Sequence, residues 1–600
     1  MSDRARPGFG RYLTLLGPYK RAYAAGLLLL FCTNAFTLAV PRLIKAAVDR
    51  VAPPPGDGPA PSLWDPLVAG PWQLAATLIG VGLVLAFART ASRVVMLGVG
   101  RQVARDLRRK VFGRLLVAAP SFYSKFPTGE IMSRSIGDLR ILQGVASPGV
   151  LYTFNAVFMF AIAVPYLAWI DGWLTLYLLI PYPFLAVWTM LAATRVRRYS
   201  RQAQEAMDRL STRIQEALGG IDVIRAFTLE EEQAGRFAEA NDDYLRKSMS
   251  EAVTRGGIMI GSVLTGGIGT FVLLWFGGQR VAEKTISYGD LALFLSVMGL
   301  VLRPTIYLGW VLSLGQRGLA SLERLDELLD APRTIVSPEQ PEGRGPVRGE
   351  LEARELSYRY PGDSERREAL KAVSFKVQAG KSLGLTGRIG SGKSTLLRAV
   401  PRLLELEPQQ LLVDGVPLEG WDLADLRSGI GYVPQDGYVF SLSLGENVAF
   451  GAPDATPRDV LDAAKVAELE KDLDQLEAGL ETLIGERGVT LSGGQRQRLA
   501  IARAVLINPP ILLLDDALSM VDAETAVQIL QNLRAALPAT TLLVAAHRTA
   551  TLLGVDELLV LDEGAVVERG TPQDLLADAD SRFAHMHERQ KLEASLRETE

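Results

Sequence analysis

The sequence reads Gly387-Arg388-Ile389-Gly390-Ser391-Gly392-Lys393-Ser394-Thr395 directly after an apolar run at 382–386. That run has the length and composition of a buried strand, and a helical pattern opens at Thr395. Glycines at this spacing let backbone N–H groups close around phosphate oxygens at the positive end of a helix. Strand, glycine-rich loop and helix in this order predict a phosphate-binding loop in an α/β domain.

A second apolar run, 511–515, ends in the adjacent carboxylates Asp515 and Asp516. In a site for ATP and Mg²⁺, we expect Lys393 to reach the outer phosphates and Ser394 to ligate the magnesium. Asp515, at the end of a buried strand, suits a second magnesium contact through water. The backbone around the phosphates would come from Gly387, Gly390, Ser391, Gly392 and Thr395.

Length and composition divide the chain into unequal halves. A chain of 600 residues is too long for one compact domain. Hydrophobic residues make up 48% of it, and the long apolar runs fall in the first half. The net charge of -3 gives no support to a nucleic-acid partner.

Six apolar runs in the first half are each long enough to cross the ~30 Å of bilayer hydrocarbon. They lie at 23–48, 74–97, 151–170, 173–193, 258–281 and 288–312. We therefore expect a six-helix, all-α membrane domain at 1–315 and a polar linker at 316–350. An α/β P-loop ATPase domain is expected at 351–600.

Basic residues predict the orientation of these spans. Lys and Arg are frequent in the segments after the second and fourth runs, whereas 52–72 contains neither. The positive-inside rule places both termini and the ATPase domain in the cytoplasm, with the chain in the cell (inner) membrane. The two basic segments are helical in pattern and roughly 45 to 60 residues long, too long for structureless loops. We expect the membrane helices to continue into the cytoplasm. Turns near 121–130 and 219–227 would either contact the ATPase domain or only cap the membrane domain.

A few polar residues lie inside the expected spans. Arg303, Arg89 and Arg93 would face a wet cavity or a partner, or else the spans are drawn too long and these side chains reach the surface. Asn34 and Asn155 are weaker candidates for a substrate cavity, because interhelical hydrogen bonding is the competing explanation.

Further motifs resemble those of ATP-binding cassette (ABC) transporters. Gln435 and His547 are similar to the Q-loop glutamine and the switch histidine of that family, and Tyr360 resembles the aromatic residue that stacks on adenine. Residues 485–488 read Gly-Glu-Arg-Gly, which is typical of the exporter branch. The signature loop is matched by Leu491, Ser492, Gly493, Gly494 and Gln495. With the six spans, the resemblance covers essentially the whole chain and indicates a half-size exporter, of which two chains make one transporter.

The resemblance implies ATP hydrolysis that drives export of drugs, lipids or peptides across a lipid membrane, together with a second half-transporter subunit. Ser492, Gly493 and Gly494 would bind the nucleotide held by the other subunit. Gln435 would contact the magnesium, and His547 the γ-phosphate or the attacking water. An importer fits these features poorly, and the spans exclude a soluble ATPase acting on nucleic acid.

Asp516 departs from the family pattern, which has glutamate there. A base must lie within hydrogen-bond reach of its water, and an offset of ~1 Å costs on the order of 100-fold in rate. Beside an intact signature loop, Asp516 is similar to one subunit of heterodimeric exporters, in which one site is slow and the other competent. The alternative is a harmless variation in a homodimer. A third possibility is a regulatory or channel-like protein gated by ATP. The pair His585 and His587 either binds metal or is a solvated helix end.

Overall fold

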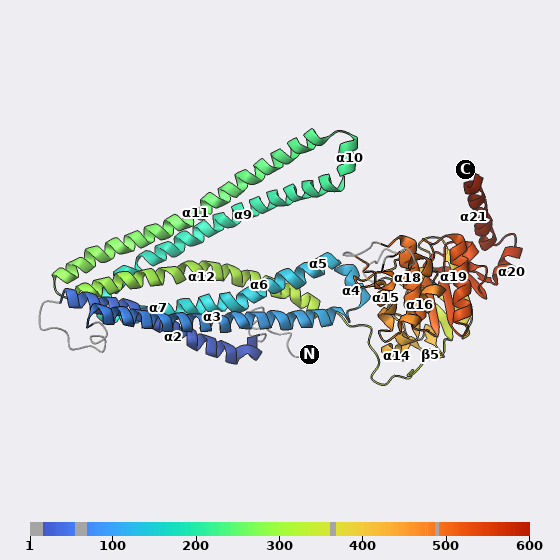
Figure 1. Ribbon diagram of the computed structural model, residues 1–600, viewed down its shortest axis with the longest axis horizontal. Coiled ribbons are helices and arrows are strands. Elements are labelled where there is room, and N and C mark those ends of the chain that lie inside the picture. The colour runs from blue at the N-terminus through green and yellow to red at the C-terminus, as the bar shows by residue number, and fades with distance from the viewer. Residues whose placement is uncertain are drawn as a thin grey trace. The chain divides into compact units, whose positions relative to one another are not determined.

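The computed structural model describes residues 16–53, 69–360, 368–473, 476, 478–485 and 491–599. The side chain of Arg303 and residues 486–488 of the exporter-type motif lie outside the described part. The chain forms two compact units (Figure 1). The first extends to Leu116 and includes Thr128–Asp330, and the second combines Val117–Pro127 with the chain from Ala331 onward.

The first unit consists of long helices joined by short helical segments. The long helices are α2 (Lys20–Val51), α3 (Pro71–Leu115), α7 (Val150–Ile170), α9 (Pro181–Gly219), α11 (Glu230–Ala282) and α12 (Tyr288–Leu329). The shorter segments are η1 (Gly17–Tyr19), α5 (Thr128–Ser133), η3 (Arg134–Asp138), α6 (Leu139–Gly144), η4 (Val145–Gly149), α8 (Gly172–Leu179) and α10 (Ile221–Ala226).

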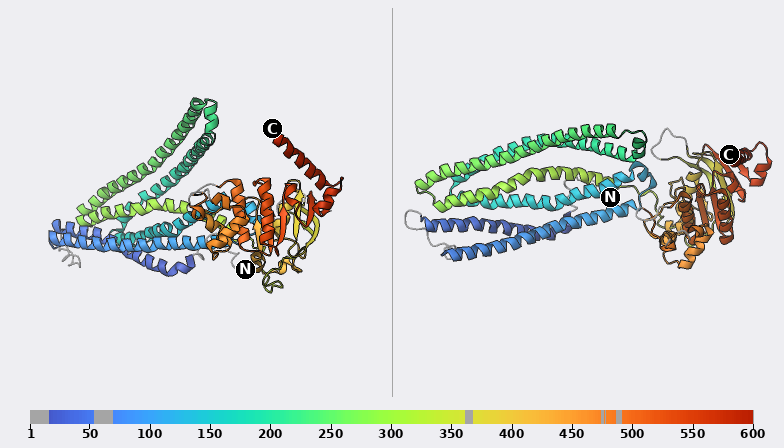
Figure 2. Two further views of the ribbon diagram at one scale, coloured as in Figure 1. Left: turned by 45° about the vertical axis from the view of Figure 1, so that its right-hand side comes forward. Right: turned by 45° about the horizontal axis from the view of Figure 1, so that its top comes forward.

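Helices α9 and α11 run side by side, and the short α10 connects them at one end (Figures 1 and 2). At 1.5 Å per residue, the 53 residues of α11 span about 80 Å, more than twice the hydrocarbon thickness. The helices therefore continue well beyond the membrane, as the sequence predicts. Segment α4 (Pro120–Lys125) belongs to the second unit, where the N–H of Ala119 donates to the Pro332 carbonyl at 3.3 Å.

All six expected apolar runs lie in helices, but the fourth is interrupted. Within the described residues, four helical segments are long and apolar enough to span a membrane: Gly17–Val51, Pro71–Leu115, Thr128–Ile170 and Glu230–Ala282. Tyr288–Val301 is a shorter apolar stretch of α12. The run at 173–193 is divided because α8 ends at Leu179 and α9 begins at Pro181. Proline has no N–H to continue a helix and is favoured at the first position of a new one.

The expected linker also differs from the structure, because its first part is helical. Helix α12 continues to Leu329. Leu322, Leu325 and Leu328 recur at every third position and are at most 2% exposed, so this stretch has a buried helical face. We expected a polar connector because the long apolar run ends at about 312. That expectation did not take into account the narrow buried face formed by the three leucines.

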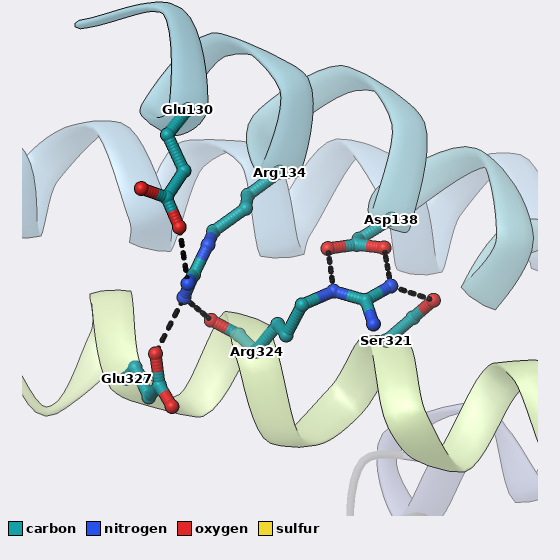
Figure 3. A network of polar contacts seen from close by, with 6 residues as sticks. All are labelled: Glu130, Arg134, Asp138, Ser321, Arg324 and Glu327. Carbon is teal, nitrogen blue, oxygen red and sulfur yellow. Dashed lines mark hydrogen bonds and ion pairs between the residues drawn. The ribbon is translucent and has the colours of Figure 1, made fainter. Parts of the chain in front are cut away.

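Two ion-pair clusters hold α12 against η3 (Figure 3). The Arg324 guanidinium donates to both carboxylate oxygens of Asp138, with Nε at 2.9 Å from Oδ2. Arg134 donates to Glu327 and to Glu130, each at 2.6 Å, and to the Arg324 carbonyl at 3.0 Å. Four of these residues, all but Glu130, thus join two segments that are 186 to 193 positions apart in the sequence.

The second unit contains two sheets and the helices that cover them. The six-stranded sheet has the order β10-β9-β3-β8-β7-β6, parallel except for β10. Its strands are β3 (Ser382–Gly387), β6 (Ile430–Val433), β7 (Ile511–Asp515), β8 (Thr541–Ala545), β9 (Glu557–Asp562) and β10 (Ala565–Gly570). The four-stranded sheet contains β2 (Leu370–Val377), β1 (Leu351–Tyr358), β4 (Leu411–Val413) and β5 (Val416–Pro417).

Strand β7 is buried on both faces, which explains its continuous apolar sequence. Leu512 and Leu514 pack into one hydrophobic cluster with α18 (Gly493–Leu506) and α19 (Ala523–Ala536). Ile511 and Leu513 point to the other face, toward α13 (Lys393–Ala399). The remaining helices are α14 (Leu423–Ser428), α15 (Leu444–Val448), α16 (Pro457–Val466), α17 (Glu470–Leu473), α20 (Pro572–Ala577) and α21 (Arg582–Thr599).

Candidate nucleotide-binding site

Four parallel strands bring the expected site residues to one edge of the six-stranded sheet. Gly387 ends β3 and Asp515 ends β7, while Gln435 and His547 each follow a strand, β6 and β8, by two residues. The carboxyl ends of parallel strands meet at a common edge, which is where α/β proteins bind ligands. Residues from 387 to 547 therefore gather at one place.

The loop after β3 has a backbone that needs its glycines. Gly387, Gly390 and Gly392 have φ values of 139°, 81° and 105°, a region that residues with a Cβ rarely adopt. A Cβ on Gly387 would lie 2.0 Å from the Leu561 carbonyl oxygen. Helix α13 begins at Lys393, two residues before Thr395, where the sequence pattern placed its start.

The Lys393 side chain folds back over this loop. It is 6% exposed, and its Nζ donates to the carbonyls of Gly387 at 2.9 Å and Arg388 at 3.0 Å. Burial lowers the pKa of Lys393, and the charges of Asp516 and Asp515 oppose that shift. The ammonium group is thus held beside the phosphate loop, and an incoming anion would compensate its desolvation.

Ser394 and Asp515 are paired in the arrangement that a magnesium site needs. The Ser394 hydroxyl donates to Asp515 Oδ1 at 2.7 Å, and the Tyr432 hydroxyl lies 3.3 Å from Oδ2. Burial raises the pKa of Asp515, while both hydroxyl contacts lower it. Hydroxyl and carboxylate oxygens are hard ligands of the kind that Mg²⁺ prefers, so the residues present fit this cofactor.

Other residues of the loop are placed for the rest of a nucleotide. Ser391 is 2% exposed within the loop. The Thr395 hydroxyl lies 3.2 Å from that of Tyr360. The Tyr360 ring is 40% exposed and meets Tyr358 edge to face, with the centroids 5.0 Å apart. An exposed aromatic face is suited to stacking on a base.

Asp516 lies beside Gln435 and near His547. Its Oδ2 accepts from Gln435 Nε2 at 3.4 Å, and its N–H donates to the Ala545 carbonyl at 2.9 Å. The residue is 9% exposed and has a positive φ of 49°. Burial, and secondarily the charge of Lys393, lowers the pKa of His547, whereas Asp516 raises it. The neutral imidazole is therefore favoured.

The signature loop begins helix α18. Ser492 is the N-cap: its hydroxyl accepts from the Gln495 N–H at 3.2 Å, and its own N–H donates to Gln495 Oε1 at 2.9 Å. A Cβ on Gly493 would lie 2.4 Å from the Met520 sulfur, and one on Gly494 would lie 2.9 Å from the Met520 carbonyl. These glycines allow the signature loop to approach the segment that follows Asp516.

Gln497 is a residue of the site that the sequence analysis missed. It is 1% exposed, and its Nε2 lies 3.3 Å from the Asp516 carbonyl and 3.4 Å from that of Gln435. Its Oε1 accepts from the Met520 N–H at 2.9 Å. A signal for it was present, because Gln497 shares the buried face of α18 with Ile501, and buried amides are hydrogen-bonded.

Two residues of α21 contact the segment that contains His547 and Thr549. Gln590 Nε2 donates to the His547 carbonyl at 2.8 Å, and Gln590 Oε1 accepts from the Thr549 N–H at 2.9 Å. His587 Nδ1 lies 3.0 Å from the Thr549 hydroxyl. The interpretation of the histidine pair as a solvated end therefore fits His585, which is exposed, but not His587. The described residues contain no cluster of three or more metal-binding side chains.

In the membrane unit, the two candidate asparagines meet each other. Asn34 Nδ2 donates to Asn155 Oδ1 at 3.2 Å and joins α2 to α7. Both residues also line a cavity of about 230 Å³ together with Arg89 and Arg93. The two asparagines therefore form an interhelical hydrogen bond and also line a cavity, two roles that the sequence analysis treated as alternatives.

Comparisons with known proteins define the class of protein. Residues 23–305 match the family model "ABC transporter transmembrane region", and residues 370–519 match the model "ABC transporter". The chain is 32% identical over 96% of both lengths to the probable multidrug resistance ABC transporter ATP-binding/permease protein YheI of Bacillus subtilis. It is 36% identical to the ATP-dependent lipid A-core flippase of Aromatoleum aromaticum, over 81% of this chain and 80% of that protein. The chain belongs to the ABC transporter family.

A solved structure narrows the fold. A bacterial Atm1-family ABC exporter with ATP bound superposes with a TM-score of 0.73 at 25% identity, over 95% of this chain and 98% of the other. The protein is a multi-pass membrane exporter of this fold, with a helical transmembrane domain and an α/β nucleotide-binding domain. It couples ATP hydrolysis to transport.

Proposed function

We propose that this chain is one subunit of a heterodimeric ABC exporter. The phosphate-loop site of this chain hydrolyses ATP slowly. The dimer moves small hydrophobic or amphipathic compounds, such as drugs, lipids or peptides, out across the cell membrane. The observation that carries the proposal is Asp516, a short carboxylate at the position of the general base in a site that has the expected phosphate and magnesium residues.

Nucleotide binding does not require a longer carboxylate at this position. The glycines of the loop, Lys393, and the pair Ser394 and Asp515 supply the phosphate and magnesium contacts. When bound, Mg²⁺ neutralises charge that develops on the phosphates. The Asp516 carboxylate reaches one methylene less far than glutamate, so a water placed for glutamate lies too distant for proton transfer. Binding is retained, and turnover at this site is slow.

The intact signature loop supports division of labour between two chains. In the closed dimer of this family, Ser492, Gly493 and Gly494 complete the nucleotide site of the partner. A partner with glutamate at the position of Asp516 would then hydrolyse ATP rapidly in the site that this signature loop completes. Because each nucleotide contacts both chains only when they are closed, ATP binding favours the closed state.

The experiment is to measure ATP turnover by the purified chain alone and mixed with each candidate partner. Turnover that appears only with a partner, and that survives Asp516→Asn in this chain, supports the proposal. Robust turnover by the isolated chain, abolished by Asp516→Asn, would instead establish a homodimer. The alternative of a homodimer is supported by the presence of all the expected nucleotide-binding residues in one chain. ATP-dependent accumulation of a dye against its gradient in inside-out vesicles separates an exporter from an ATP-gated channel.

A further inference from the structure

The cavity of about 230 Å³ in the membrane unit carries an unusual set of charges. Arg89 and Arg93 are four positions apart on α3 and both line it. Neither guanidinium has a hydrogen bond or an ion pair with any residue that the structure describes. No acidic residue occurs among the described residues that line the cavity. Charged residues within membrane helices are costly and mark functional pathways.

The charged hydrogen-bonding groups in this cavity are all donors, and Asn34 Oδ1 with the hydroxyls of Tyr152 and Tyr307 are neutral groups of the lining that can also accept. The hydroxyls of Thr33, Thr37 and Ser92 donate to carbonyls of their own helices at 2.7 to 2.9 Å. Asn155 accepts from Asn34 through its Oδ1, which leaves the Asn155 amide N–H groups without a partner among the described residues. Two guanidinium groups and one amide therefore present N–H groups to the same space, and such a set matches the oxygens of an anion.

The rest of the lining includes apolar and aromatic residues. Leu30, Leu151 and Met159 are 4 to 6% exposed. The rings of Tyr152 and Tyr307 stack with centroids 4.7 Å apart. A drug-sized ligand needs a cavity of about 300 to 1,000 Å³, so this one is too small for such a molecule. Its size suits a headgroup with the first methylenes of a chain.

The depth of the cavity agrees with a headgroup. Helix α3 begins at Pro71, beside Trp72, which is 88% exposed as expected at a membrane surface. At 1.5 Å per residue, Arg89 lies about 27 Å and Arg93 about 33 Å along the helix from Pro71. Counted back from Ile170, the end of α7, Asn155 lies at about 22 Å. The hydrocarbon is ~30 Å thick, so the two arginines lie near its far boundary, on the side where the helices continue beyond the membrane, and Asn155 lies about 8 Å inside that boundary.

From this geometry we infer that Arg89, Arg93 and Asn155 form a site for the phosphate or carboxylate headgroup of an amphiphile taken from the cytoplasmic leaflet. The apolar tail lies along Leu30, Leu151 and Met159. The inference rests on the proposed function, because it names the chemical class of the exported compound. It assigns the two arginines a role in substrate selection rather than in anchoring the helix.

The test measures binding without ATP, so that it does not depend on turnover. The full-length chain, with its partner where one is required for purification, is placed in phosphatidylcholine nanodiscs. Four probes are titrated by calorimetry: decyl phosphate, decylphosphocholine, decyltrimethylammonium and inorganic phosphate. The first three share one tail and differ in headgroup charge. We expect decyl phosphate to bind at least about tenfold more tightly than the other three probes, because charge-assisted hydrogen bonds are the strong ones.

Variants assign the preference to the two arginines. Arg89→Gln with Arg93→Gln removes the preference for decyl phosphate, whereas Arg89→Lys with Arg93→Lys retains part of it. Arg101→Gln is the matched control on the same helix, because Arg101 does not line the cavity, and it leaves the preference unchanged. Thermal unfolding of each variant in the nanodiscs shows that its membrane unit has folded, and ATP binding shows the same for its nucleotide-binding unit.

Equal affinities for the three decyl compounds, or a preference that survives the double glutamine change, would overturn the inference. Inorganic phosphate binding as tightly as decyl phosphate would overturn the part that requires a tail. Uphill transport of a neutral dye in inside-out vesicles tests the proposed function separately. A protein that transports the dye but shows no anion preference keeps the proposed function and loses this inference.

Discussion

The side-chain amide of Gln590 donates to the backbone carbonyl of His547 at 2.8 Å, so the C-terminal helix α21 holds the backbone of His547 in place. The same amide accepts from the Thr549 N–H at 2.9 Å. These two bonds fix the backbone on either side of Arg548, at the end of β8. We therefore expect Gln590 to position His547 without contacting the nucleotide.

Gln590→Ala should lower kcat for ATP at this chain's own site about five- to tenfold while KM for ATP stays nearly constant. A hydrogen bond contributes about 1 kcal/mol net, and 1.4 kcal/mol corresponds to a factor of ten in rate. Gln590→Glu is the sharper variant, because its carboxylate still accepts from Thr549 but cannot donate to His547. Lys591→Ala, at an exposed position of the same helix, should have no effect. A change in KM alone would contradict the positioning role.

Asp516→Glu should raise ATP turnover at this chain's own site by on the order of 100-fold, since one methylene restores the reach of the base. ATP affinity should not change, because Lys393, Ser394 and Asp515 are untouched. Turnover is measured by phosphate release and affinity by nucleotide titration. Glu524→Asp is the control: it makes the reverse change on the exposed first turn of α19 and should leave turnover unaltered. A rate unchanged by Asp516→Glu would show that reach is not the limit.

Local patterns account for what the sequence predicts well in the nucleotide-binding unit. The strand expected at 511–515 matches β7 residue for residue, and the strand at 382–386 is one residue shorter than β3. When a continuous apolar run ends at a carboxylate or a glycine, the end of the run predicts the end of the strand. Both strands are buried on two faces, and strands buried in this way have continuous apolar sequences.

Contacts between distant segments could not be predicted in the same way. Gln497 bonds to residues 19 to 62 positions away, and Gln590 to one that is 43 positions away. Nothing in either local sequence names those partners. The interruption of the fourth apolar run differs, because Pro181 in the sequence predicts it. The average hydropathy over the run is high throughout and does not show the interruption.

Gln497→Leu should destabilise the nucleotide-binding unit by about 2 kcal/mol. The leucine keeps the volume but leaves the carbonyl of the buried Asp516 without the Gln497 donor and the Met520 N–H without its acceptor, and an unsatisfied buried group costs about 1 to 3 kcal/mol. Thermal unfolding of the variant, followed by calorimetry, measures the effect. Gln528→Leu, on the exposed face of α19, should change stability by less than about 0.5 kcal/mol. Equal losses of stability for the two variants would mean that the buried contacts of Gln497 do not stabilise the unit more than those of the exposed Gln528.

Arg324→Ala should destabilise the membrane unit by about 2 kcal/mol, because it leaves the Asp138 carboxylate, only 8% exposed, without its charged donor. Asp138→Asn should cost less, since a neutral amide tolerates burial better than an unpaired charge. The double variant should lose less than the sum of the two single changes, because the residues share one interaction. Arg209→Ala is the control, as its pair with Asp243 is 62% and 34% exposed and should contribute under about 1 kcal/mol. Additive losses in thermal unfolding would show that Arg324 and Asp138 do not stabilise the contact between η3 and α12 as a pair.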